Sequence, residues 1–109
     1  MASPLECSFG SFRAGEPVVV TVNGEVDLAT SSELEQCVLR ALEGAPSSVV
    51  LDLGGLTFID SSGLRTLVST SRAASTRDAT LALRNVPSHA QRVLDLTGLA
   101  DSFPLADES

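Results

Sequence analysis

The sequence predicts an α/β domain with a mixed central sheet and helices packed on it, and two observations point to this fold class. Short runs of β-branched and aliphatic residues alternate along the chain with longer segments whose apolar residues recur at helical spacing. The predicted order is strand, strand, helix, strand, helix, strand and helix, which is typical of a sheet covered by helices.

The N-terminal part of the chain predicts two strands joined by a turn. We expect residues 1–4 to fray and residues 8–12 to form a first strand, although a glycine weakens it. Residues 14–17 read Ala-Gly-Glu-Pro, which is a turn pattern. The β-branched run at residues 18–22 predicts a strand, and we expect Asn23-Gly24 to end it.

The middle of the chain predicts a helix followed by a strand. Thr30 and Glu33 have the spacing of a capping box, and the apolar periodicity after them predicts a helix through Glu43. Residues 49–53, Val-Val-Leu-Asp-Leu, predict a strand covered on both faces. The glycines at 54–55 predict a turn after that strand.

The C-terminal half predicts two more helices and two short strands. Residues 64–71 show a helical pattern, and residues 79–83 predict a short strand. Pro87 suits the first turn of a third helix, and Gly98 is the expected stop. Residues 102–105 predict a last strand.

Composition indicates one small acidic domain. The 109 residues suffice for a single domain, with its core at about residues 5–105 and an acidic tail at 107–108. The chain has 7 Lys and Arg against 14 Asp and Glu, a net charge of -7, which opposes binding to nucleic acid or to an anionic membrane. A basic protein surface is the natural complement. Because the sequence shows neither a signal-peptide pattern nor an apolar run of about 20 residues, we expect a cytoplasmic protein.

The two cysteines do not predict a redox or disulfide site. Cys7 and Cys37 form no CxxC motif, and two cysteines are too few for a disulfide scaffold. Cys37 falls on a predicted helix, where we interpret it as a small apolar residue.

The sequence predicts no enzyme, no metal and no cofactor. A serine hydrolase needs a base, and the single histidine, His89, lies at the start of a predicted helix, where we interpret it as a surface or capping residue. The chain has neither a Gly-x-Ser-x-Gly nucleophile elbow nor a glycine-rich phosphate loop. We interpret Asp52 as a strand-end residue and Asp95 as part of a solvated helix face. Four aspartates lack metal-ligand spacing: Asp27, Asp52, Asp60 and Asp95.

The segment from Leu56 to Leu64 carries the most information. An apolar run breaks into Asp60, two serines and a glycine, and a helical pattern then begins. One reading is structural, because Asp and Ser are preferred helix N-caps. The other is a phosphorylation switch, because a helix N-terminus favours an anion, while a phosphate would add about -1.5 to -2 of charge beside an acid. Spacing alone leaves both readings open.

Three segments of the chain resemble one known family. Residues 58–64, Phe-Ile-Asp-Ser-Ser-Gly-Leu, resemble the signature of the STAS domain, and specifically of bacterial anti-sigma factor antagonists. Residues 24–30, Gly-Glu-Val-Asp-Leu-Ala-Thr, are similar to that family's Gly-Glu-hydrophobic-Asp segment. Residues 93–99, Val-Leu-Asp-Leu-Thr-Gly-Leu, resemble its last helix. The resemblance implies one STAS domain over residues 1–109, with a mixed sheet of about four to five strands.

The resemblance also implies a mechanism of regulation. In this family the serine after the motif's Asp is phosphorylated by an anti-sigma factor that is also an ATP-dependent kinase. The unmodified antagonist binds the anti-sigma factor and so releases the sigma factor; phosphorylation switches binding off, and a serine phosphatase restores it. By this resemblance Ser61 is the phosphorylated residue. Seven residues are implied in partner binding: Asp27, Asp60, Ser61, Ser62, Gly63, Leu64 and Arg65.

Particular roles follow from the same resemblance. Asp27 would help form the kinase-facing surface, Asp60 would flank the acceptor, and Gly63 would let the partner approach the start of the helix. Arg65 occupies a variable position, where it would tune partner choice, lie in solvent or pair with phosphorylated Ser61.

A second class of function stays open. Other STAS domains are non-switching subunits of stress-sensing assemblies, or of lipid-transport machinery that contains an ATPase. The chain is short and has no extra sensory domain, which argues against the first role. Its intact Asp-Ser-Ser-Gly segment argues against the second.

Overall fold

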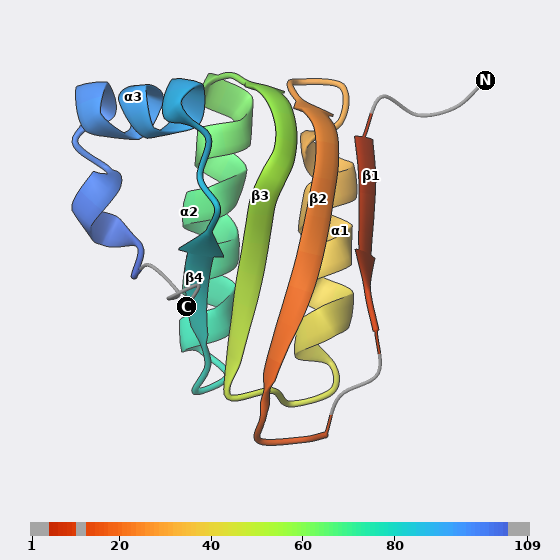
Figure 1. The fold of residues 1–109 in the computed structure, drawn as a ribbon. Helices are drawn as coiled ribbons and strands as arrows, with labels where there is room; N and C mark the ends of the chain where they lie inside the picture. The colour runs from red at the N-terminus through yellow and green to blue at the C-terminus, as the bar shows by residue number, and fades with distance from the viewer. Residues whose placement is uncertain (1–4, 11–12, 105–109) are drawn as a thin grey trace.

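A four-stranded mixed sheet carries two helices on one face (Figure 1). The computed structural model describes residues 5–10 and 13–104. The elements in chain order are β1 (Leu5–Phe9), β2 (Pro17–Val26), α1 (Ser31–Leu42), β3 (Ser48–Ile59), α2 (Ser61–Ser75), β4 (Thr80–Arg84), α3 (Ser88–Thr97) and a short 3₁₀-helix, η1 (Ala100–Ser102).

The strand directions decide where loops gather. The order across the sheet is β1-β2-β3-β4; β1 runs antiparallel to β2, whereas β2, β3 and β4 run parallel. The carboxyl ends of β2 and β3 therefore lie at the same edge, at the top of Figure 1, and the loops into α1 and α2 start beside each other.

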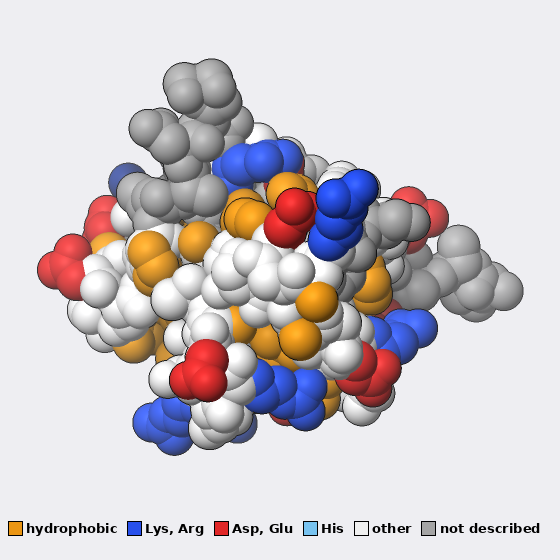
Figure 2. Space-filling model, turned by 90° about the horizontal axis from the view of Figure 1, so that it is seen from below, with side chains coloured by type: hydrophobic (Ala, Val, Ile, Leu, Met, Phe, Trp, Pro, Cys, Tyr) orange, Lys and Arg blue, Asp and Glu red, His pale blue; other side chains and the backbone are white. Residues whose placement is uncertain are grey.

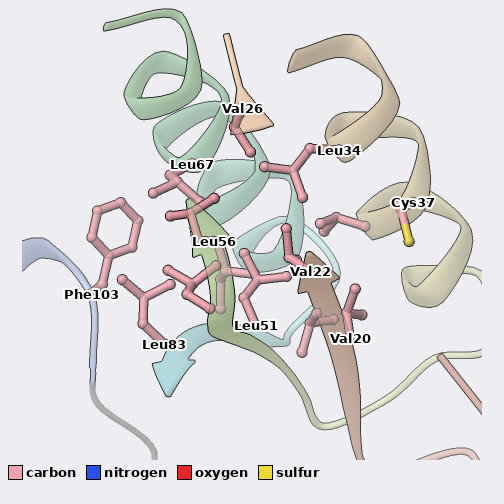
Figure 3. Packing of buried hydrophobic residues seen from close by; sticks show 14 of the residues in the cluster. Val20, Val22, Val26, Leu34, Cys37, Leu51, Leu56, Leu67, Leu83 and Phe103 are labelled. Carbon is pink, nitrogen blue, oxygen red and sulfur yellow. The ribbon is translucent and has the colours of Figure 1, made fainter. Parts of the chain in front are cut away.

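The core lies between the sheet and the two helices α1 and α2. Figure 3 shows Val22 and Leu51 from the sheet pointing toward Leu34 of α1 and Leu67 of α2. These side chains are almost fully buried, and the aromatic ring of Phe103 closes the cluster near β4. The low aromatic content of the sequence is thus matched by a core of valine and leucine.

The strands β2 and β3 are longer than predicted, because both predicted stops lie inside strands. Asn23-Gly24 belongs to β2, where two register shifts absorb the irregular backbone and Gly24 adopts a φ of +111°. Gly54 and Gly55 belong to β3. A Cβ on Gly55 would overlap the Asn23 side chain, so this glycine makes room for a cross-strand neighbour instead of a turn.

The first and last predicted strands are also corrected. The first runs from Leu5 to Phe9, with Leu5 buried and Cys7 and Phe9 packed against the core at period two. Residues 11–12 of the predicted strand lie outside the described residues. Of the predicted strand at 102–105, residues 102–104 are described: Ser102 ends η1, and the carbonyl of Pro104 accepts a hydrogen bond of 2.9 Å from the Leu83 N–H. Residues 105–109, including the predicted acidic tail, are outside the described part, as are residues 1–4.

The third helix follows its sequence signals closely. Pro87 is the N-cap of α3 and not a first-turn residue, whereas Gly98 ends the helix in the left-handed conformation with φ +76°. His89 is exposed, and its Nε2 lies 3.0 Å from the carbonyl oxygen of Leu56.

The two cysteines are neighbours in space. Cys37 is buried on α1, as its predicted apolar role requires, and Cys7 is partly exposed on the edge strand β1. The thiol hydrogen bond between them, together with burial, raises the pKa of Cys7 far above its usual range. The same hydrogen bond lowers the pKa of Cys37, although burial opposes it; the nearby Arg40 charge lowers it further.

Asp52 lies within β3, not at its end, and its side chain connects β3 to Arg84 at the end of β4 and to Asn85. Its carboxylate accepts hydrogen bonds from Arg84 Nη2 at 3.0 Å, from the Gly54 N–H at 3.0 Å and from Asn85 Nδ2 at 3.2 Å. Partial burial acts to raise the pKa of Asp52, but the hydrogen bonds from Gly54, Arg84 and Asn85, with the charge of Arg84, hold that pKa below its ordinary value of 3.8.

Gly63, in the first turn of α2, is buried and packs directly on the strand ends. A Cβ at this position would lie 2.6 Å from Cγ1 of Ile59 and 2.8 Å from Cγ1 of Val26. These distances are shorter than van der Waals contact, and both neighbours are core residues. The groups that approach Gly63 closely are therefore side chains of the protein's own core.

We predict that Asp52→Asn flattens the acid dependence of stability. Because its pKa is lower in the folded than in the unfolded chain, charged Asp52 stabilises the fold above the unfolded pKa, and this stability is lost as the pH falls through the folded pKa. The free energy of unfolding of the wild type should therefore fall more than that of the variant between about pH 5 and pH 2. Urea denaturation across this range measures both; Asp95→Asn, which removes an exposed carboxylate on α3, is the control, and equal slopes for Asp52→Asn and wild type would contradict the assignment.

We predict that Gly63→Ala destabilises the protein. Alanine favours a helix over glycine by about 1 kcal/mol, so the variant would gain stability if its methyl group had space. Overpacking against Val26 and Ile59 should cost about 1–3 kcal/mol and outweigh that gain. Urea denaturation followed by circular dichroism measures the difference, with Gly10→Ala, whose Cβ would meet open space, as the control. A Gly63→Ala protein as stable as wild type would refute the packing argument.

Candidate functional site

Two loops meet at the carboxyl ends of β2 and β3. In the ladder Val26 is paired with Ile59, and the Asp60 N–H donates a hydrogen bond of 3.2 Å to the Val26 carbonyl. The start of α2 is thus tied to the end of β2. This contact brings together two of the three segments that carried the family resemblance, residues 24–30 and 58–64.

Asp27 holds the loop between β2 and α1. Its Oδ1 accepts hydrogen bonds from the Ala29 N–H at 2.9 Å and from the Thr30 N–H at 3.0 Å. The Asp27 carbonyl accepts from the Ser31 N–H at 2.8 Å. The side chain therefore organises its own loop while remaining partly exposed.

Thr30 is buried and joins this loop to the strand. Its hydroxyl donates to the Glu25 carbonyl at 2.8 Å and accepts from the Asp27 N–H at 3.0 Å. The predicted capping box is therefore wrong for the Thr30 side chain, which makes no cap hydrogen bond to α1. The hydroxyl points back to the end of β2, and the sequence alone does not reveal that carbonyl partner.

Asp60 caps α2, so the structural reading of this segment is confirmed for one residue. Its Oδ1 accepts hydrogen bonds from the Ser62 N–H at 2.9 Å and the Gly63 N–H at 3.2 Å. Within the described residues the structure gives no hydrogen bond to the hydroxyl of Ser61, which is the first residue of the helix and is exposed. The capping hydrogen bonds of α2 therefore do not involve the Ser61 side chain.

The other predicted site residues divide into exposed and buried groups. Arg65 is exposed one helical turn beyond Ser61, on the same face of α2, and Ser62 is partly exposed. Leu64 is only 6% exposed and belongs to the core, as Gly63 does. These two residues support the helix start from within.

The electrostatics of this end favour a basic partner. Glu25, Asp27 and Asp60 belong to the two segments that meet at the start of α2, and Ser61 lies at the positive end of the α2 dipole. At the opposite end of the molecule, drawn in Figure 2, acidic and basic side chains are interspersed among neutral ones.

In the described part of the chain, the structure gives the Ser61 hydroxyl no hydrogen bond to a histidine. His89 belongs to α3 and is hydrogen-bonded to the carbonyl of Leu56 in β3. The described residues contain no cluster of three or more metal ligands. The described residues also line shallow hollows elsewhere on the surface. One, of about 320 Å³, lies between α2 and η1, and another, of about 360 Å³, lies beside His89 and Arg92. None of the helices in the described part of the chain is both long and apolar enough to cross a membrane.

Comparison with known proteins identifies relatives. The family model of the STAS domain matches residues 13–109. An anti-sigma-B factor antagonist of Staphylococcus epidermidis is 33% identical over 82 residues, which cover 75% of this chain and 76% of the relative. The crystal structure of an anti-sigma factor antagonist from Mycobacterium paratuberculosis is 26% identical with a TM-score of 0.80, covering 99% of this chain and 92% of that one.

A further structural neighbour has been solved in two states. SpoIIAA in its unphosphorylated form is 21% identical with a TM-score of 0.74, covering 94% of this chain and 90% of that one. The phosphorylated Bacillus form is 22% identical with a TM-score of 0.68, covering 94% and 93%. At these identities the likeness shows the fold. The predicted mixed α/β fold and the resemblance are both confirmed, and the chain belongs to the STAS domain family.

Proposed function

We propose that this protein is an anti-sigma factor antagonist switched by phosphorylation of Ser61. In its unphosphorylated form it binds a kinase-type anti-sigma factor and so frees a sigma factor. Phosphorylation by that kinase ends binding, and a serine phosphatase restores it. The proposal describes a cytoplasmic binding protein without catalytic activity of its own.

One observation carries the proposal: Asp60 caps α2 and leaves the hydroxyl of Ser61 exposed. A residue needed for capping would lose a structural hydrogen bond when modified. Ser61 has no such bond within the described residues, so a phosphate can be added without breaking one. The names of the relatives support the general role.

The physical chemistry of the switch follows from the charges around Ser61. A phosphate at the first residue of α2 is favoured by the positive end of the helix dipole, so the fold should tolerate it. On the surface it adds negative charge beside Asp27 and Asp60 and places a bulky dianion where the partner must dock. Binding then requires that dianion to be desolvated and to fit a contact shaped for the smaller, uncharged hydroxyl.

We predict that incubation with ATP and a kinase-type anti-sigma factor adds one phosphate, on Ser61. Intact mass followed by peptide mapping identifies the site. Ser61→Ala should take up no phosphate, and labelling of that variant would redirect the assignment to Ser62. Tight binding with no phosphate transfer would favour a non-switching STAS subunit instead.

We predict that Ser61→Asp keeps the fold but weakens binding to the anti-sigma factor by at least about tenfold, or about 1.4 kcal/mol. Ser61→Ala should bind as the unmodified protein does. Ser69→Asp is a matched control, because it adds the same charge at an exposed position two turns along α2. Isothermal titration calorimetry measures the affinities, and wild-type affinity for Ser61→Asp would count against the switch.

A further inference from the structure

Large apolar side chains are exposed at three places in the described part of the chain. Leu28 is 79% exposed, Phe58 is 47% exposed and Leu96 is 80% exposed. Single exposed apolar residues are common and need no explanation. Leu28, in the loop after β2, and Phe58, near the end of β3, belong to the two segments that meet where α2 starts, whereas Leu96 lies on α3.

Leu28 and Phe58 flank the same cross-strand pair. Val26 of β2 is paired with Ile59 of β3. Leu28 lies two residues after Val26, and Phe58 lies one residue before Ile59. Ser61 lies two residues beyond Ile59. Both apolar side chains therefore belong to the end of the sheet from which α2 starts.

The backbone fixes both side chains in outward positions. Asp27 binds the N–H groups of Ala29 and Thr30, so the loop on which Leu28 stands is held on both sides of it. Phe58 precedes the buried Ile59 on the same strand, and successive strand residues point to opposite faces. A backbone that is held in place before binding loses little conformational freedom when it binds.

The surroundings of this apolar pair are acidic. Glu25 lies directly across from Phe58 in the ladder, and Asp27 is adjacent to Leu28 in the chain. Asp27 and Asp60 each use only one carboxylate oxygen, Oδ1, in the hydrogen bonds of the described residues. A second oxygen of each carboxylate is left to meet a cation on a partner.

We propose that Leu28 and Phe58 are the apolar anchors through which the unphosphorylated surface around Ser61 binds its anti-sigma factor, and that the partner offers an apolar pocket bordered by Arg or Lys side chains. This inference rests on the proposed function. It assigns binding energy to two residues that the STAS motif does not identify, since interface energy concentrates in a few well-buried anchors. It also gives the switch a second cause, because a phosphate at the same end of the sheet would add charge that must be desolvated close to these apolar contacts.

The test uses the anti-sigma factor that the wild-type protein binds in calorimetry. Leu28→Ala and Phe58→Ala should each weaken binding by about tenfold or more. Leu96→Ala removes an equally exposed leucine from α3 and should stay within about twofold of wild type. Burial of apolar surface makes the heat-capacity change of binding negative, so this change should be less negative for Leu28→Ala than for wild type. Leu28→Met keeps an apolar side chain of similar volume and should bind nearly as wild type does.

The outcomes separate this inference from the proposed function. If wild type and Ser61→Ala bind and Ser61→Asp does not, while Leu28→Ala and Phe58→Ala bind as wild type does, the anchors are refuted and the switch stands. If Leu28→Ala, Phe58→Ala and the control Leu96→Ala lose affinity equally, the effect is not specific to this surface and the inference is also overturned. If no kinase-type anti-sigma factor binds the wild type, the proposed function is contradicted and the anchors with it. Leu28→Ala and Leu96→Ala should unfold at the wild-type temperature because both leucines are exposed. Phe58→Ala should lose some stability because Phe58 is about half-buried, so its binding is measured at a temperature at which circular dichroism shows the variant folded.

Discussion

Two aspartate side chains fix the geometry on which the candidate site depends. Asp60 caps α2 through the N–H groups of Ser62 and Gly63, and Asp27 binds the N–H groups of Ala29 and Thr30. Each accepts hydrogen bonds from backbone donors at the point where a strand leads into a helix. Asp27 and Asp60 therefore stabilise the two loops, and the exposed residues of these loops remain available to contact other molecules.

The packing under α2 serves the same arrangement. Gly63 lets the first turn of the helix lie against Val26 and Ile59, which are themselves a cross-strand pair. The helix start therefore cannot shift without disturbing the core. A phosphate at Ser61 would be added to a rigid platform, and we expect its effect to appear at the surface and not in the fold.

The sequence predicts the fold class, the strand at 18–22 and the cap at the start of α2, because each rests on a local pattern. Features that depend on distant pairs escape prediction. Asn23-Gly24 resembles a turn but is a strand irregularity, since the Asn23 side chain occupies the space beside Gly55. The Thr30 hydroxyl satisfies the capping pattern by spacing, yet it binds the carbonyl of Glu25. The sequence pattern likewise does not predict that Leu28 and Phe58 are exposed, because by residue type both are expected in the core.

The most direct test of the account is an NMR comparison of the protein with phosphoserine incorporated at position 61 and the unmodified protein. Amide chemical shifts should change only in residues 24–30 and 58–65, and the melting temperature should stay close to that of the unmodified protein. The phosphorylated protein should at the same time fail to bind the anti-sigma factor that the unmodified protein binds. Shift changes spread through β2, β3 and the core, or a large loss of stability, would contradict the claim that the phosphate changes the surface and spares the fold.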